Sequence, residues 1–150
     1  MALNAYLKLK GQKIGEVKGS VTQKGREGKI MVIAVSHEIV SPRDAASGLP
    51  TGKRMHKPFV ITKELDKSTP LLYQVLTQNE NLPTWELEFW QPSATGAERQ
   101  HYTVKLTNAN IASWTQNGAT EQIGFTYQKI TWTWVDGGIT AQDDWETPVS

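Results

Sequence analysis

The chain has 150 residues, a formal net charge of +1 and no cysteine. This length fits a single domain over residues 1–150, and the near-neutral charge gives no overall field that would draw the protein to nucleic acid or anionic lipid. The absence of cysteine excludes a disulfide framework. Long apolar stretches are also absent, so the sequence predicts no signal peptide and no membrane insertion. We therefore expect the protein to fold in the cytoplasm.

Apolar side chains alternate with polar ones along most of the chain, which predicts β-strands. In chain order, the strands are expected near residues 6–10, 29–40, 59–62, 84–90, 100–106, 109–115 and 120–134. One segment departs from this period. Pro70 suits a first helical turn, and leucine and valine then recur every three or four residues, which predicts one amphipathic helix over about residues 69–79. The elements together predict a mainly β fold, a compact antiparallel barrel or sandwich whose helix covers an open end or side.

A long segment without strand or helix pattern, residues 41–58, connects two of the predicted strands. It contains one acid, Asp44, and five basic side chains, which are Arg43, Lys53, Arg54, His56 and Lys57. Irregular loops longer than about 12 to 15 residues are uncommon in compact domains, because a lid, ligand or partner must offset their ordering entropy. This extended loop is therefore the first candidate for a functional surface.

The dipeptide Asn117-Gly118 predicts a tight hairpin between the strands near residues 109–115 and 120–134. Both residue types tolerate positive φ, which two-residue hairpin turns require. We expect these strands to be neighbours in an antiparallel sheet.

The last predicted strand has apolar side chains on both of its faces. One parity carries Ile123, Phe125 and Tyr127, and the other carries Ile130, Trp132 and Trp134. Either a bulge near residues 128–129 brings both groups to one face, or both faces are covered, one by the core and one by another chain. The six tryptophans of the chain favour the second interpretation, because tryptophan is enriched in interfaces between chains.

Motifs for catalysis, cofactors and metals are incomplete. The segment GLPTGKR has three residues between Gly48 and Gly52 where a phosphate loop has four, and Arg54 occupies the position of its magnesium-binding serine or threonine. The three histidines lack ligand spacing. Asp143 and Asp144 are neighbours on an extended segment with no evident partner for acid–base chemistry. The sequence predicts no enzyme, no cofactor and no metal site.

Three binding interpretations remain for the extended loop and the tryptophans. A nucleic-acid-binding module would place the loop cations at phosphates, and a carbohydrate-binding module would stack sugars on exposed tryptophans. An oligomer would lay the loop on another copy and pair its cations with acids such as Glu86, Glu88, Asp143 and Asp144. We favour the oligomer, because opposed charged patches also explain a near-neutral total charge.

The chain closely resembles the haemolysin-coregulated protein (Hcp) family, the tube-forming component of bacterial type VI secretion, in residues 36–76, SHEIVSPRDAASGLPTGKRMHKPFVITKELDKSTPLLYQVL. Further matches stand in family order along nearly the whole chain, at Ala5 to Lys8, Gly11, Gly15, Gly19, Leu106 to Ala109, Phe125, Tyr127, Lys129, Ile130, Trp132, Gly138 and Asp143 to Trp145. One departure is a short segment, SWTQNGATEQIG, where family members commonly carry a longer one.

The resemblance implies a subunit that assembles head-to-tail into hexameric rings, and rings that stack into a tube. The tube would form in the cytoplasm, inside a contractile sheath and with spike and baseplate proteins. It would then be secreted without an N-terminal signal peptide, with effectors in its lumen and without nucleic acid or membrane as partners. The resemblance also implies contacts between subunits, through loop residues Arg43, Gly48, Gly52, Lys53, Arg54, His56 and Lys57, and through strand and tail residues Trp132, Trp134, Asp143, Asp144 and Trp145.

Overall fold

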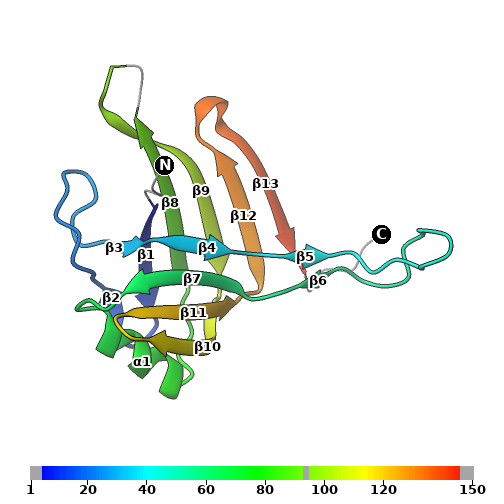
Figure 1. The fold of residues 1–150 in the computed structure, drawn as a ribbon, viewed down its shortest axis with the longest axis horizontal. Helices are drawn as coiled ribbons and strands as arrows, with labels where there is room; N and C mark the ends of the chain where they lie inside the picture. Colours follow the sequence, from blue (N-terminus) through cyan, green and yellow to red (C-terminus); the bar gives the residue numbers. More distant parts are fainter. Residues whose placement is uncertain (1–4, 93–94, 146–150) are drawn as a thin grey trace.

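The computed structural model describes residues 5–92 and 95–145 (Figure 1). Its helices are α1 (Thr69–Thr77) and a short 3-10 turn, η1 (Asp136–Gly138). Its strands are β1 (Ala5–Gly11), β2 (Gly15–Val17), β3 (Ile30–Val32), β4 (Ala34–Ser36), β5 (Ile39–Val40), β6 (Met55–His56), β7 (Phe59–Glu64), β8 (Thr84–Pro92), β9 (Glu98–Thr107), β10 (Asn110–Asn117), β11 (Thr120–Thr126), β12 (Lys129–Trp134) and β13 (Ile139–Asp144).

The strands form two packed sheets and a small ribbon, with antiparallel pairing throughout the described residues. The larger sheet has the order β13-β12-β9-β8-β1-β2, with β3 also paired to β1. The smaller sheet has the order β10-β11-β7-β4, and its strands run across those of the larger sheet (Figure 1). The predicted mainly β fold is confirmed, and the arrangement is a sandwich rather than a closed barrel.

The core lies between the two sheets. Trp85 of β8 is 1% exposed, and its ring meets those of Phe59 and Phe125 edge-on, at centroid distances of 5.2 and 5.4 Å. Phe59 and Phe125 come from the smaller sheet, so these three aromatic rings join the two layers. Edge-to-face aromatic pairs contribute about 0.5–1.5 kcal/mol each beyond the area they bury.

The single predicted helix is confirmed as α1, which ends two residues earlier than expected. Pro70 lies in its first turn, where a missing backbone N–H costs nothing. Leu72 and Val75 are buried, and Tyr73 stacks on Trp114 of β10 with a centroid distance of 4.0 Å. The helix therefore packs its apolar side against one end of the sandwich, beside β10 (Figure 1).

Two predicted long strands are each divided, because the chain crosses from one sheet to the other. Residues 30–36 leave the larger sheet after β3 and join the smaller one as β4. The expected strand over residues 120–134 leaves the smaller sheet after β11 and joins the larger one as β12. Phe125, Tyr127 and Ile130 are all buried, so the crossing near residues 127–128 turns both parities toward the same core. This break explains the burial of Ile130 and the packing of Trp132 without a second chain, whereas Trp134 stays 43% exposed.

The predicted hairpin forms between β10 and β11, with Asn117 paired to Thr120. Its central residues are Gly118 and Ala119 rather than Asn117 and Gly118. Gly118 has a φ of +61°, whereas Asn117 is not among the residues with positive φ. Glycine at the first central position is typical of a type II′ turn, so the register of the turn differs by one residue from the expected one.

Candidate assembly surface

The extended loop is a β-ribbon that projects from the body of the sandwich (Figure 1). Strands β5 and β6 pair at its base, and Arg43 and Pro50 form a further bridge beyond them. We call residues 39–57 the arm. The expectation of an irregular loop is thus corrected, since ladder hydrogen bonds order much of the segment. Bending the ribbon would break these hydrogen bonds and leave backbone groups without partners. The ribbon therefore restricts the directions in which the arm can point.

The tip of the arm is a compact turn. The Asp44 carboxylate accepts a hydrogen bond from the backbone N–H of Ser47 at 2.7 Å, and Gly48 has a φ of +75°, which a residue with a Cβ rarely adopts. Gly52 has no such requirement, because its φ is not positive and a Cβ there would meet nothing within 4 Å. The turn leaves Leu49 65% exposed, and an exposed leucine at the end of an ordered projection is available for contact.

At its base the arm is tied to β13 by an ion pair with two parallel hydrogen bonds. Arg54 Nε and Nη2 donate to the two carboxylate oxygens of Asp143 at 2.6 and 2.8 Å, and Nη2 also donates to the Asp144 backbone carbonyl at 3.0 Å. His56 Nε2 lies 2.7 Å from Asp143 Oδ2, and the His56 side chain is only 1% exposed. Bidentate arginine–carboxylate pairs are directional, so they fix orientation as well as contributing energy.

A tyrosine hydroxyl extends this contact toward β4. Tyr127 Oη lies 2.7 Å from His56 Nδ1 and 2.8 Å from His37 Nε2. A hydroxyl has a single proton, so Tyr127 donates to one imidazole and accepts from the other. Trp145 packs beside His56 and donates from Nε1 to the Tyr127 carbonyl. We call His37, Arg54, His56, Tyr127 and Asp143 the arm root.

The environment of the arm root shifts the titration of three of its members. The hydrogen bonds from Arg54, and less strongly from His56, hold the pKa of Asp143 below its ordinary value of 3.8. Burial lowers the pKa of His37 from its ordinary 6.5, and the nearby His56 adds to this effect. Burial raises the pKa of Tyr127. At neutral pH the root therefore contains a carboxylate, a neutral His37 and a protonated phenol.

Acidification is expected to destabilise the fold through this cluster. His37 has a lower pKa when folded than when unfolded, so its contribution is complete above about pH 6.5 and is lost as the pH falls below that value. Asp143 also has a lowered pKa, and its contribution is lost at still lower pH, as the pH falls through its folded pKa. Urea denaturation at several pH values measures the free energy of unfolding. Just below pH 6.5, this free energy should fall less in His37→Gln than in the wild type. An equal dependence on pH in the two proteins would contradict this assignment.

The structure brings together four of the residues predicted to contact other subunits. Arg54, His56, Asp143 and Trp145 meet at the arm root of their own chain. Within the chain, Arg54 and His56 pair with Asp143, which β13 places beside them, and their contact with another copy remains a prediction. Asp143 and Asp144 also lie in a paired strand and not in a free tail.

Asp144 touches this cluster through its carbonyl, and the remaining predicted residues of the arm and β12 lie apart from it. Arg43 and Lys53 are exposed on the arm, whereas Lys57 lies 3.8 Å from Glu38 in an exposed pair that contributes little. On β12, Trp132 is half-buried against the core and Trp134 is 43% exposed. These positions remain predictions as contact residues.

Sequence reasoning missed two members of the arm root, His37 and Tyr127. Both looked like single residues of regular strands, and their meeting depends on a chain crossing between sheets. The sequence contained one signal, the switch of the apolar positions from odd to even residue numbers after Tyr127. Such a switch marks a place where the chain leaves one sheet for another, so a residue there contacts different neighbours from the rest of its strand.

Within residues 5–92 and 95–145, no group of three or more histidine, cysteine, aspartate or glutamate side chains is arranged to hold a metal ion. No helix in the described part of the chain is long and apolar enough to cross a membrane. The GLPTGKR segment lies in the arm, not between a strand and a helix as a phosphate loop does.

Comparison with known proteins gives consistent matches. The family model described as "Type VI secretion system effector, Hcp" matches residues 6–134. The Major exported protein of Pseudomonas aeruginosa is 38% identical over an alignment of 171 residues that covers 100% of this chain and 99% of that protein. This alignment is longer than the 150-residue chain, so the relative carries insertions, in keeping with the shortened segment noted in the sequence.

Solved structures agree with these matches. A mutant of the Hcp1 protein from E. coli has a TM-score of 0.88 and 36% identity, over 95% of this chain and 98% of that one. The secreted protein Hcp3 from Pseudomonas aeruginosa has a TM-score of 0.82 and 34% identity, over 94% of this chain and 99% of that one.

Proposed function

Since the chain belongs to the Hcp family of type VI secretion effectors, we propose that it is a structural subunit of the secretion tube. Residues 1–150 act as one domain. Subunits assemble head-to-tail into hexameric rings, and the rings stack into a tube whose lumen carries effectors. The tube assembles in the cytoplasm with contractile sheath, spike and baseplate proteins and is then exported. Hcp is a family of secreted proteins and not of enzymes, and we infer that this chain acts without catalysis or cofactor.

The arm is the observation that supports this proposal most directly. It projects beyond the sandwich, carries exposed Leu49, Arg43 and Lys53, and is held at its root by buried hydrogen bonds. An ordered projection loses less entropy on docking than a flexible loop does. Such a segment is suited to lie on a second copy, and Arg43 and Lys53 are the cations we assign to contacts between subunits.

Binding of carbohydrate or nucleic acid has less support. All six tryptophans lie in the described part of the chain, and only Trp134 is exposed. One exposed tryptophan does not make a stacking platform. Arg54, one of the few loop cations, is already bound to Asp143.

Light scattering after gel filtration tests the assembly. We expect a mass close to six chains, and ring-shaped particles in negative-stain images. A matched variant replaces residues 43–50 with an Asn-Gly turn, which removes the arm tip and leaves the arm root intact. This variant should keep the circular dichroism spectrum and lose the assembled species. A strictly monomeric wild type at moderate salt would overturn the proposal.

A further inference from the structure

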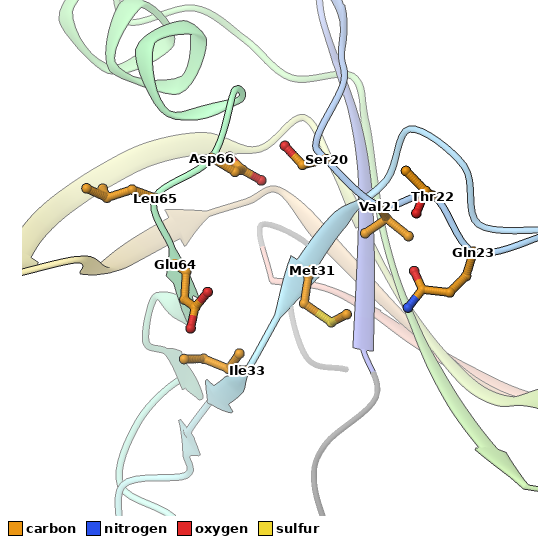
Figure 2. A pocket seen from close by; sticks show the side chains of 9 residues that line it. All are labelled: Ser20, Val21, Thr22, Gln23, Met31, Ile33, Glu64, Leu65 and Asp66. Carbon is orange, nitrogen blue, oxygen red and sulfur yellow. The ribbon is translucent and has the colours of Figure 1, made fainter.

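A solvent-open pocket of about 400 Å³ lies at the end of β7 (Figure 2). Four apolar side chains line it, Val21, Met31, Ile33 and Leu65, together with the acids Glu64 and Asp66. Ile33 and Leu65 are 42% and 43% exposed and lie together in this pocket, so part of its apolar surface is open to solvent. We call this site the acidic pocket. Its volume lies within the range of sites that bind small ligands or a few side chains.

The acidic pocket and the arm lie at opposite ends of the same pair of strands. Strand β7 leaves the arm at Phe59 and reaches the pocket at Glu64, while the chain from β3 to β5 runs from the pocket to the arm (Figure 1). A strand of six residues spans roughly 20 Å. The arm points away from the body, so it does not reach the pocket of its own chain. Any arm that enters the pocket belongs to another molecule.

The tip of the arm and the acidic pocket are complementary in charge and polarity. The tip, residues 43–50, presents Leu49, 65% exposed, and the exposed cation Arg43, and the exposed Lys53 follows three residues after it on the arm. Its single acid, Asp44, is occupied by the hydrogen bond from Ser47. No lysine or arginine is among the described residues that line the pocket.

The two acids of the pocket differ in availability. Asp66 lies 3.1 Å from the buried Lys63 ammonium and accepts a hydrogen bond from Ser68, so its charge is largely compensated. Glu64 lines the pocket and is exposed to solvent. A cation on an incoming partner would therefore meet Glu64 first, and such rim pairs steer association more than they add affinity.

We propose that the acidic pocket receives the arm tip of a neighbouring copy, with Leu49 among the apolar side chains and Arg43 or Lys53 beside Glu64. The inference rests on the proposed function and adds the place where the arm docks. The contact is heterologous, because the surface that donates and the surface that receives differ. Contacts of this kind generate a ring when the rotation between neighbouring copies closes.

Disulfide trapping tests the contact on a clean background, because the chain has no cysteine of its own. Leu49→Cys is combined with Ile33→Cys in the pocket, and the matched control combines it with Ile139→Cys, which is 68% exposed on β13. We call the Leu49→Cys, Ile33→Cys combination the pocket pair. Under mild oxidation of micromolar protein, we expect the pocket pair to form covalent oligomers at least about tenfold faster than the control pair does. Docking raises the effective thiol concentration toward the millimolar range.

A charge exchange gives a second measurement in the same background. Glu64→Arg is expected to slow disulfide trapping severalfold. Adding Arg43→Glu should restore part of the rate, because the acid and the cation of the proposed contact have then exchanged positions. Both positions are exposed, so neither substitution is expected to affect folding.

The outcomes separate this inference from the proposed function. If light scattering shows six-chain assemblies while the pocket pair links no faster than the control pair, the docking site is wrong and the tube proposal stands. Links mainly between the arm tips of two copies, each through its Leu49→Cys thiol, or a link within one chain, would also overturn the docking site. A monomeric wild type would overturn both.

Discussion

Lys63→Met is expected to lower the free energy of unfolding by roughly 3–5 kcal/mol, because it leaves a buried carboxylate without its cation. Lys63 is 0% exposed, and its ammonium lies 3.4 Å from Glu121, which is 1% exposed. The same ammonium donates to the Glu64 carbonyl and to Thr69 Oγ1 at 3.0 and 3.2 Å. The pair lies beside the start of α1, so its loss affects the junction of helix and sheet. Urea denaturation at a fixed protein concentration measures the change.

Two variants make this prediction specific. Lys53→Met removes an exposed cation from the arm and should change the unfolding free energy by less than about 0.5 kcal/mol. Lys63→Met combined with Glu121→Leu should be more stable than Lys63→Met alone, because the second substitution removes the fully buried carboxylate, while Asp66 keeps its hydrogen bond from Ser68. A single Lys63→Met variant as stable as the wild type would contradict this prediction.

Arg54→Glu is expected to open the arm root and to weaken assembly. The substitution removes the bidentate bonds to Asp143 and places a carboxylate beside Asp143 and the Asp144 carbonyl. The ribbon beyond the root depends on this anchor for its direction. Hydrogen exchange measured by mass spectrometry should show peptides of β5 and β6 exchanging on the order of tenfold faster or more, since charge-assisted bonds are the strong ones. Light scattering should show fewer six-chain assemblies at the same concentration.

Lys53→Glu is the matched control for this substitution. It makes the same charge change one residue earlier, at an exposed position. We expect it to affect assembly through contact with a neighbour and to leave exchange in β5 and β6 unchanged. Equal acceleration in both variants would mean that net charge, and not the Arg54–Asp143 contact, controls the order of the arm.

In the proposed assembly, the acidic pocket and the arm root have separate roles. The root would set the direction of the arm, and the pocket would receive its tip. A variant of the root should therefore alter exchange within the monomer, whereas Glu64→Arg should alter only contacts between copies. This difference follows from geometry, since the two sites lie at opposite ends of β7.

The sequence alone determined the features that depend on local pattern. Alternating apolar residues predicted the strands, and Pro70 with its following leucines predicted α1, because side-chain periodicity is a property of the element itself. The motif of residues 36–76 was long enough to indicate the family, which the match to residues 6–134 confirms. The projection of residues 41–58 was also expected, although not its ribbon structure.

The tertiary structure decided what depends on residues distant in the chain. Arg54 and His56 meet Asp143 across 89 and 87 positions, and no local pattern contains that pairing. The acidic pocket joins residues 20–23, residues 31 and 33, and residues 64–66, so it exists only once the sheets have packed. The chain changes sheets after β3 and again after β11, and these crossings bring the distant residues together. A crossing redirects the side chains toward new neighbours, but the alternation of apolar and polar residues on each side of it stays the same.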